Sequence, residues 1–357
     1  MTKKVLFKLI LFCGGLFFII CRLTVILTLK EYKAGPNVNV LLNRNMLCEK
    51  QDGFYSLEEN CLDVVFLGSS NIHCNVNPNV IWNDYGITSY NYSCDQQELG
   101  TTYYYLQQVF ETQSPKVVVI DIMSDGSEDI IGTNQAHWAF DHMKNDRYRI
   151  EAIWKRTREA RMELYFPIIA YHGRWKELTE NDYKYKSNQH NILNGSFIYM
   201  IDGKMEHPNI PDSIPKTKLH PKTIFWLDSL IELCEKNDCE CVFIKTPYTI
   251  YVEEWFAYYD AVEEYCQSKD VTFLNFNKRV DDVGLDFTTD YADWGHMNWN
   301  GQKKFSDYLG EYLTNNYDLE NKHGNPKYIQ WDEDYKSMME YVDDFWGKWE
   351  QKENSDD

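Results

Sequence analysis

The sequence has no excess of positive charge. Its 55 Asp and Glu residues outnumber its 36 Lys and Arg residues, which gives a formal net charge of −19 over 357 residues. Phosphate backbones are repelled by a surface of that sign, so a nucleic-acid partner is not expected. The chain also has no evident internal repeat or low-complexity tract. Its organisation therefore has to be inferred from the patterns of individual strands and helices.

Regular cysteine pairs are missing as well. Cys234, Cys239 and Cys241 lie close together but do not form two C-x-x-C knuckles, so we expect no structural zinc there. Two of the ten cysteines, Cys13 and Cys21, fall in the apolar N-terminal run. The remaining eight are an even number, which permits disulfides without indicating how they would pair.

Charge is nearly absent from residues 9–29, where only Arg22 interrupts an apolar run that Lys3, Lys4 and Lys8 precede. A helix of about 20 apolar residues can span a bilayer. No small-x-small cleavage site follows the run, which favours an uncleaved signal anchor over residues 1–30 rather than a cleaved signal peptide. Lysines on the amino side predict a cytoplasmic N-terminus and an extracytoplasmic domain. Arg22 would then reach the outer interface or contact a partner helix.

Beyond this anchor, residues 31–61 are polar and indicate a stalk that leads into the domain. Short apolar runs then alternate with helical patterns through residues 62–315. The alternation predicts an α/β domain with a parallel sheet and helices on both faces. The strand-like runs are Leu62–Leu67, Ile87–Tyr90, Val117–Ile122, Cys241–Lys245 and Val271–Leu274.

Two segments depart from this alternation. Residues 123–220 are rich in Trp, Tyr, His and Arg, and an insertion of about 100 residues is too long for an ordinary loop, so a mainly helical cap is expected. Residues 316–357 form an acidic, amphipathic tail that either packs back on the domain or docks onto a membrane partner. Its apolar face would consist of Met338, Val342, Phe345 and Trp349.

A serine and a histidine stand where parallel strands are predicted to end. Ser70 follows the run Leu62–Leu67 through a Gly-Ser turn, which places it at the edge of the sheet where ligands bind. His296 lies three residues after Asp293, in a loop after the last predicted strand. A nucleophilic serine needs a base, and that base needs a carboxylate to fix its tautomer. Ser69 competes with Ser70 as the nucleophile.

The carboxylate also has alternatives. Asp286 and Asp290 lie in the same predicted loop, and solvated or capping roles are favoured for both. Asp293 is preferred because its spacing supplies the base and its partner from one loop.

The stretch Phe66-Leu67-Gly68-Ser69-Ser70 resembles the first block of the SGNH/GDSL hydrolase superfamily, with Ser69 in place of the usual aspartate. Asp293-x-x-His296 resembles its last block. The resemblance covers roughly residues 60–315 and is closest to the membrane-anchored branch that includes D-alanyl-lipoteichoic acid transfer and alginate O-acetylation proteins. It implies a three-layer, flavodoxin-like fold. It also implies Ser70 as nucleophile, His296 as base and Asp293 as its orienting acid.

The same resemblance implies neither a metal nor a cofactor. His137, Asp141 and His142 have a helical spacing that could suit a metal, but the chemistry of the superfamily does not need one.

The middle blocks depart from the family pattern. Ser93 stands where the second block has glycine, so the oxyanion hole would consist of Ser70 N–H with Ser93 N–H or the Gln97 amide. The third block lacks its asparagine, because Ser124-Asp125-Gly126 follows Met123. A catalytically degenerate protein that binds glycan or scaffolds an envelope-modification complex therefore stays an alternative.

The resemblance implies an esterase or O-acyltransferase of the cell membrane that acts on ester-linked acyl groups of envelope glycans. The acceptor would be a cell-envelope polysaccharide or a teichoic-acid-like polymer, and a membrane-bound O-acyltransferase would be the partner that supplies the acyl group. The alternative enzymatic hypothesis is a simple carbohydrate esterase. We expect the insertion to line a groove beside Ser70. His172, Arg174 and Trp175, next to Tyr171, would bind substrate there unless they form a buried aromatic cluster.

Overall fold

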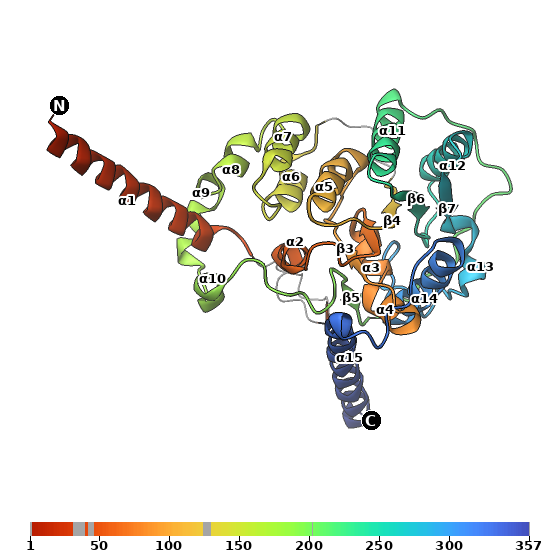
Figure 1. The fold of residues 1–357 in the computed structure, drawn as a ribbon. Helices are drawn as coiled ribbons and strands as arrows, with labels where there is room; N and C mark the ends of the chain where they lie inside the picture. Colours follow the sequence, from red (N-terminus) through yellow and green to blue (C-terminus); the bar gives the residue numbers. More distant parts are fainter. Residues whose placement is uncertain (1, 31–39, 42–45, 124–129, 202, 357) are drawn as a thin grey trace.

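A parallel sheet lies at the centre of the domain (Figure 1). The computed structural model describes residues 2–30, 40–41, 46–123, 130–201 and 203–356. Helix α1 (Lys3–Leu27) projects from one side of the domain and the end of α15 (Ile329–Asp356) from another (Figure 1). A separate two-stranded antiparallel sheet pairs β1 (Val40–Leu41) with β5 (Ile198–Tyr199).

The main sheet has the strand order β3-β2-β4-β6-β7, and each neighbouring pair is parallel. This is the order of flavodoxin-like, doubly wound sheets, which bind ligands beyond the carboxyl ends of their strands. The strands form where the sequence has short apolar runs bounded by turns. Their bounds are β2 (Val64–Leu67), β3 (Ser89–Asn91), β4 (Val117–Asp121), β6 (Glu240–Lys245) and β7 (Thr272–Asn275).

Helices cover both faces of this sheet, because successive strand side chains point to opposite sides. Val65 and Leu67 pack into one apolar core, with α5 (Leu99–Thr112), α11 (Pro221–Glu235) and α12 (Glu253–Ser268). Val64 and Phe66 pack into the other. That second core includes α3 (Ser70–Asn75), α4 (Pro78–Tyr85), α13 (Val280–Val283) and α14 (Trp299–Asn316). The predicted three-layer α/β fold is confirmed.

Short helices make up much of the chain between β4 and α11. Helix α7 packs against α5, whereas α9, η1 and α10 contact α1. These elements are α6 (Thr133–Phe140), α7 (Arg147–Arg156), α8 (Arg161–Tyr165), α9 (Ile168–Tyr171), η1 (His172–Lys176) and α10 (Glu180–Lys184). The insertion therefore forms two parts, one on the sheet's helical layer and one around the base of α1.

The start of α15 packs on the domain. Met338 and Val342 are buried in a cluster with Val80 of α4 and with Ile198 of β5. Phe345 is packed against the same cluster, and the side chain of Trp349 lies outside the described residues. Helix α2 (Met46–Ser56) and the short turns η2 (Phe276–Lys278) and η3 (Pro326–Tyr328) complete the described elements.

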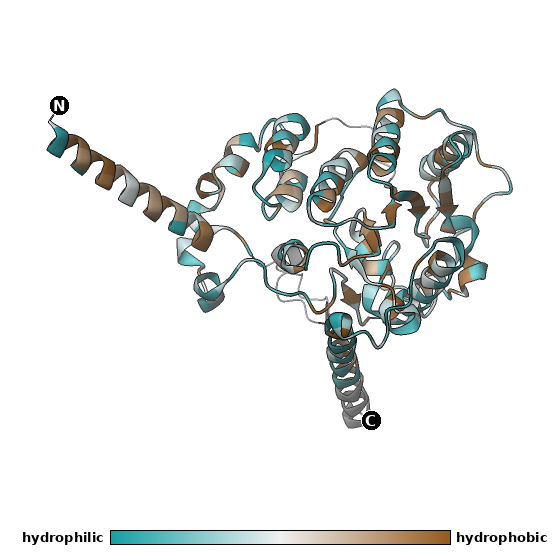
Figure 2. Ribbon diagram, in the orientation of Figure 1, coloured by the Kyte–Doolittle hydropathy of each residue, from teal (hydrophilic) through white to brown (hydrophobic). Residues whose placement is uncertain are grey.

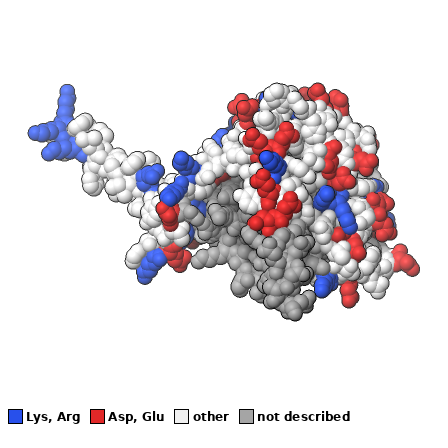
Figure 3. Space-filling view, turned by 90° about the horizontal axis from the view of Figure 1, so that it is seen from below, with Lys and Arg blue, Asp and Glu red and all other residues white. Residues whose placement is uncertain are grey.

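Helix α1 is the described helix that is long and apolar enough to cross a membrane by length and composition. Figure 2 shows hydrophobic residues along most of its length, outside the domain. In Figure 3 a group of basic residues lies at its free end, while acidic residues are spread over the domain. The nine cysteines whose side chains the structure describes are free thiols.

Candidate active site

A glycine turn places Ser70 at the carboxyl end of β2. Gly68 has a φ of +144°, which side chains disfavour, and a Cβ there would meet the Cβ and the carbonyl oxygen of Asp121 at 3.0 Å. Ser69 caps α3 by accepting a hydrogen bond from Asn71 N–H at 3.4 Å. The hydroxyl of Ser69 therefore caps the helix, and Ser70 is the serine that faces the histidine.

Ser70, His296 and Asp293 form one hydrogen-bonded chain. Ser70 Oγ lies 2.8 Å from His296 Nε2, and His296 Nδ1 lies 2.8 Å from Asp293 Oδ2. Asp293 Oδ1 accepts from the backbone N–H groups of Gly295 at 2.9 Å and His296 at 3.0 Å. The structure thus brings the three residues together in the predicted geometry. The carboxylate fixes the tautomer in which Nδ1 carries the proton and Nε2 can accept one.

The Asp293 carboxyl stays ionised at neutral pH. Its partial burial raises the pKa, but the hydrogen bonds from the imidazole and the two backbone N–H groups outweigh burial. The pKa of Asp293 is therefore held below its usual value. An ionised carboxylate beside the ring stabilises the imidazolium that forms when His296 takes a proton.

Asn75 connects the histidine loop to the helix that carries Ser70 through two hydrogen bonds. Its Nδ2 donates to Gly295 O at 3.1 Å, and its Oδ1 accepts from Met297 N–H at 2.8 Å. Asn75 is fully buried. Because it holds one backbone group on each side of His296, it sets where the imidazole lies relative to Ser70.

Aromatic side chains lie beside the histidine and along the loop that carries it. The Tyr199 ring stacks on the His296 ring at a centroid distance of 5.7 Å, and Tyr248 contacts Trp294 at 5.2 Å. Asn71 Nδ2 donates to Tyr248 Oη at 2.9 Å. Trp294 is 42% exposed, so the loop that carries the histidine also presents an indole to solvent.

A second imidazole lies one helical turn after Ser70. His73 Nδ1 lies 2.9 Å from Ser93 Oγ and 3.1 Å from Lys50 Nζ, and its Nε2 lies 3.3 Å from Asp95. Burial and the lysine charge lower the pKa of His73 to about 4, so the ring is neutral at neutral pH. Burial also lowers the pKa of Lys50. This buried network holds Ser93 against α3.

Ser93 and Gln97, both predicted for the oxyanion hole, are placed differently. Ser93 is linked to α3 through His73, whereas Gln97 is buried at the start of α5. Gln97 Oε1 accepts from Cys94 N–H at 2.9 Å, and its Nε2 donates to Thr102 Oγ1 at 3.1 Å. As a correction, Gln97 is a local cap of this turn, because both ends of its amide are bonded there. The third-block residues 124–126 lie outside the described residues.

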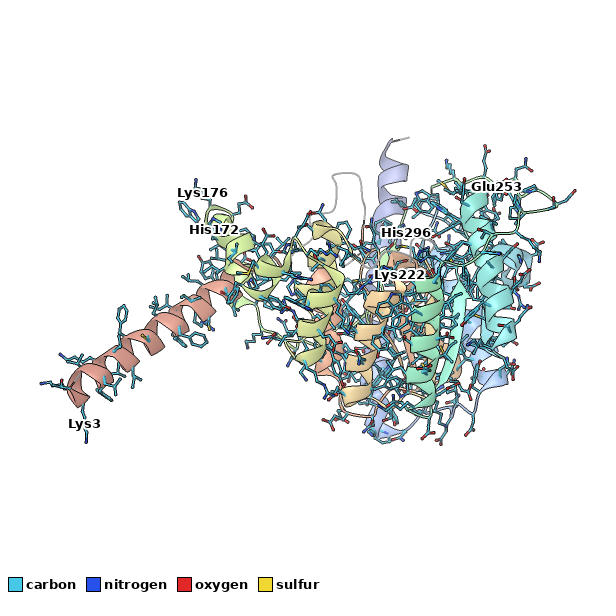
Figure 4. All side chains as sticks on the ribbon, turned by 90° about the horizontal axis from the view of Figure 1, so that it is seen from above. Lys3, His172, Lys176, Lys222, Glu253 and His296 are labelled. Atoms are coloured by element: carbon cyan, nitrogen blue, oxygen red, sulfur yellow. The ribbon has the colours of Figure 1, made fainter. Side chains whose placement is uncertain are left out.

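The predicted substrate wall requires the largest correction. Arg174 donates to the carbonyls of Leu27 and Thr28, and His172 Nδ1 bonds Ile169 O. Trp175 is 64% exposed. Figure 4 shows His172 at the base of α1, well away from His296 at the centre of the domain. Contacts between η1 and α1 hold this segment there, and Tyr199 is a residue of the insertion whose ring contacts the imidazole.

The remaining candidates have local roles. Asp290 binds Lys304 Nζ at 2.6 Å, and Asp286 Oδ1 accepts from Thr288 N–H at 2.8 Å, so neither carboxylate is bound to His296. His137 is paired with Asp141 at 3.0 Å and with Glu163. His142 lies instead 2.7 Å from Leu29 O. His142 is therefore engaged at the end of α1, apart from the His137–Asp141 pair.

No protein-family model and no curated protein sequence matches the chain. A Desulfitobacterium hafniense protein described as a lipolytic protein of the G-D-S-L family is 13% identical, with a TM-score of 0.38 over 70% of this chain and 98% of its own. A Bacteroides fragilis protein described as an acylhydrolase is 10% identical, with a TM-score of 0.38 over 74% and 94%. A GDSL-like lipase from Bacteroides thetaiotaomicron is 11% identical, with a TM-score of 0.35 over 71% and 87%. Likenesses of this degree carry no argument about activity, which has to rest on the geometry of the site.

Proposed function

We propose that this chain is a membrane-anchored serine esterase or O-acyltransferase that works through an acyl-serine intermediate. The observation that carries the proposal is the hydrogen-bonded chain from Ser70 through His296 to Asp293. Residues separated by more than 200 positions converge on one catalytic geometry at the carboxyl edge of the sheet. Ligands of doubly wound sheets bind at that edge.

The reaction would proceed in two balanced halves. Ser70 Oγ attacks the ester carbonyl while His296 Nε2 accepts the hydroxyl proton, and Asp293 stabilises the resulting imidazolium. The tetrahedral intermediate then expels the alcohol, which takes the proton from Nε2 and leaves an acyl-serine. An incoming sugar hydroxyl loses its proton to His296 and attacks that ester. A new ester forms, and Ser70 regains its proton. Water in place of the sugar gives a carboxylic acid.

Two backbone N–H groups would stabilise the oxyanion. We assign this role to Ser70 N–H and Ser93 N–H, since the Gln97 amide is bonded elsewhere. Preorganised donors of this kind supply much of the rate enhancement in acyl transfer.

The acceptor would be a glycan hydroxyl of the cell envelope, on a polysaccharide or a teichoic-acid-like polymer. Support comes from the exposed indole of Trp294 and the ring of Tyr199 beside His296, because aromatic faces suit the apolar faces of sugars. A helix capable of spanning the membrane supports a donor held in that membrane. A membrane-bound O-acyltransferase is the donor partner that we propose.

Labelling with a fluorophosphonate tests the nucleophile. The full chain in detergent should form a covalent adduct, and Ser70→Ala should abolish it. Ser114→Ala, which changes an exposed serine bonded to Asn60, is the matched control and should label like the unaltered chain. Adduct formation that persists in Ser70→Ala would assign the chemistry to another residue. A folded chain that never labels would favour a degenerate glycan-binding or scaffold protein.

A further inference from the structure

The base of α1 is bound to the insertion through its own carbonyl groups. Arg174 Nη1 donates to Leu27 O at 2.6 Å and to Thr28 O at 2.9 Å, and Arg174 Nη2 donates to Asp182 at 3.1 Å. Lys30 Nζ donates to Thr28 O at 2.9 Å and lies 3.6 Å from Asp182. Carbonyls in the last turn of a helix lack partners within it. These bonds supply the partners and fix the direction of α1 relative to the domain.

Large apolar side chains are exposed around this junction. Phe166 is 55% exposed, Ile169 45% and Trp175 64%. They lie on α9, on η1 and between α8 and α9, and α9 and η1 contact α1. Figure 1 shows α9 and α10 at the base of α1, with α8 next to α9. Exposed apolar residues gathered in one place mark a contact surface. Phe166, Ile169 and Trp175 are called the junction surface below.

The length of α1 sets the depth of this surface. A hydrocarbon layer about 30 Å thick takes about 20 helical residues. Counted from Lys8, the last lysine before the apolar run, that length ends at Leu27. Residues 3–23 are exposed, whereas Leu27 is buried against the insertion. The junction surface therefore lies at the level where α1 leaves the hydrocarbon and enters the headgroups.

The charge of the surrounding segment suits a lipid surface. Residues 158–186 contain six Lys and Arg and five Asp and Glu, a net +1 in a chain whose net charge is −19. Anionic lipids therefore do not repel this segment, whereas they repel the acidic remainder of the chain. Lys176 Nζ lies 5.1 Å from the centre of the Trp175 ring. Tryptophan rings favour the headgroup level, and lysines extend from there to water.

We propose that the junction surface rests in the headgroup layer of the leaflet from which α1 emerges. This inference depends on the proposed membrane anchoring. Together with the bonds of Arg174 and Lys30 to α1, it gives the domain a second attachment to the same membrane. Two attachments hold the domain in one orientation and keep Ser70 at a constant height above the lipid. A constant height suits acyl transfer from a donor that is held in the membrane.

Spin-label accessibility tests this contact in the full chain. Cys13 and Cys21, which are exposed, would be replaced by alanine, and the background alone would serve as the blank. Labels at Trp175→Cys and Phe166→Cys would be measured in nanodiscs of phosphatidylcholine and phosphatidylglycerol. Phe225→Cys, 59% exposed on α11, is the matched control. Oxygen collides most often with labels in lipid, and a nickel chelate with labels in water.

The ratio of oxygen to nickel collisions should be several-fold higher at positions 166 and 175 than at 225. Equal ratios at the three positions would overturn the junction surface as a lipid contact, and so would labels shielded from both agents, because a protein would then cover the surface. A label at Phe17→Cys, in the body of α1, separates the two proposals. Lipid contact at 17 without contact at 175 refutes the surface alone, whereas water contact at 17 refutes the anchoring itself.

Discussion

Asp293→Asn should inactivate the enzyme by reversing the tautomer of His296. Asp293 Oδ1 accepts from two backbone N–H groups, and Oδ2 accepts from His296 Nδ1 at 2.8 Å. In asparagine the carbonyl oxygen has to stay with the two backbone donors, since an NH2 group cannot accept from them. The NH2 group then faces Nδ1 and donates to it. The imidazole proton moves to Nε2, so that nitrogen can no longer take the proton of Ser70.

The expected loss in kcat is about 10⁴-fold, the size seen when a triad aspartate is changed in this way. It corresponds to about 5 kcal/mol of transition-state stabilisation. Hydrolysis of p-nitrophenyl acetate would measure kcat, and the rate of fluorophosphonate labelling should fall in parallel. Melting temperature should change little, because the two backbone hydrogen bonds remain.

Asp286→Asn is the matched control, because this carboxylate lies in the same loop region but bonds Thr288. It should keep full activity. If Asp293→Asn retained more than about a tenth of the activity, Asp293 would not set the tautomer and the triad as described would be refuted.

Three further predictions follow from neighbouring contacts. Asn75→Leu should lower the unfolding free energy by about 1–3 kcal/mol for each backbone group left without a partner, which urea unfolding would measure. Its kcat should fall while KM stays constant, which initial rates would measure. The buried His73, with its pKa lowered to about 4, binds fewer protons than in the unfolded chain, so stability should fall by about 3 kcal/mol as pH drops from about 6.5 to 4. His73→Gln should flatten that dependence in urea unfolding, and an unaltered dependence in this variant would contradict its assignment to His73. With soluble p-nitrophenyl acetate as the acyl donor, Trp294→Ala should reduce acyl transfer to oligosaccharides more than hydrolysis, and Trp175→Ala should change neither. Equal loss of both activities in Trp294→Ala would contradict a sugar contact there.

The sheet and the positions of the triad could be predicted because their signals are local. Val64–Leu67 is an apolar run followed by a glycine turn, and such a turn leaves the next serine at the edge of a sheet. Asp293 and His296 are three residues apart, so one loop fixes both. The strand alternation then implies that the two loops meet at the same edge.

Other parts of the site depend on tertiary contacts that sequence spacing does not show. In the sequence, Asn75 and His73 are indistinguishable from ordinary helix residues. Only the fold shows that Asn75 holds the histidine loop and that His73 holds Ser93. Gln97 was predicted as an alternative oxyanion-hole donor to Ser93 N–H, but its amide bonds Cys94 N–H and Thr102 Oγ1 instead.

Arg174 and Trp175 show the limit of reasoning from residue type. Arginine and tryptophan suit a sugar or a phosphate, but the same chemistry suits helix carbonyls and lipid headgroups. The packing of the insertion determines which of these partners Arg174 meets, and the base of α1 supplies the carbonyls that Arg174 binds. Composition alone does not distinguish these environments.

Direct detection of the acyl-enzyme tests the central claim. The full chain would be mixed with p-nitrophenyl acetate, quenched in acid within a single turnover, digested and analysed by mass spectrometry. We predict an acetyl group on the peptide that contains Ser70, and its loss on adding an oligosaccharide acceptor, with the acetyl ester recovered on the sugar. An acetyl group on a different residue, or turnover without any acetylated peptide, would contradict the proposed acyl-serine mechanism.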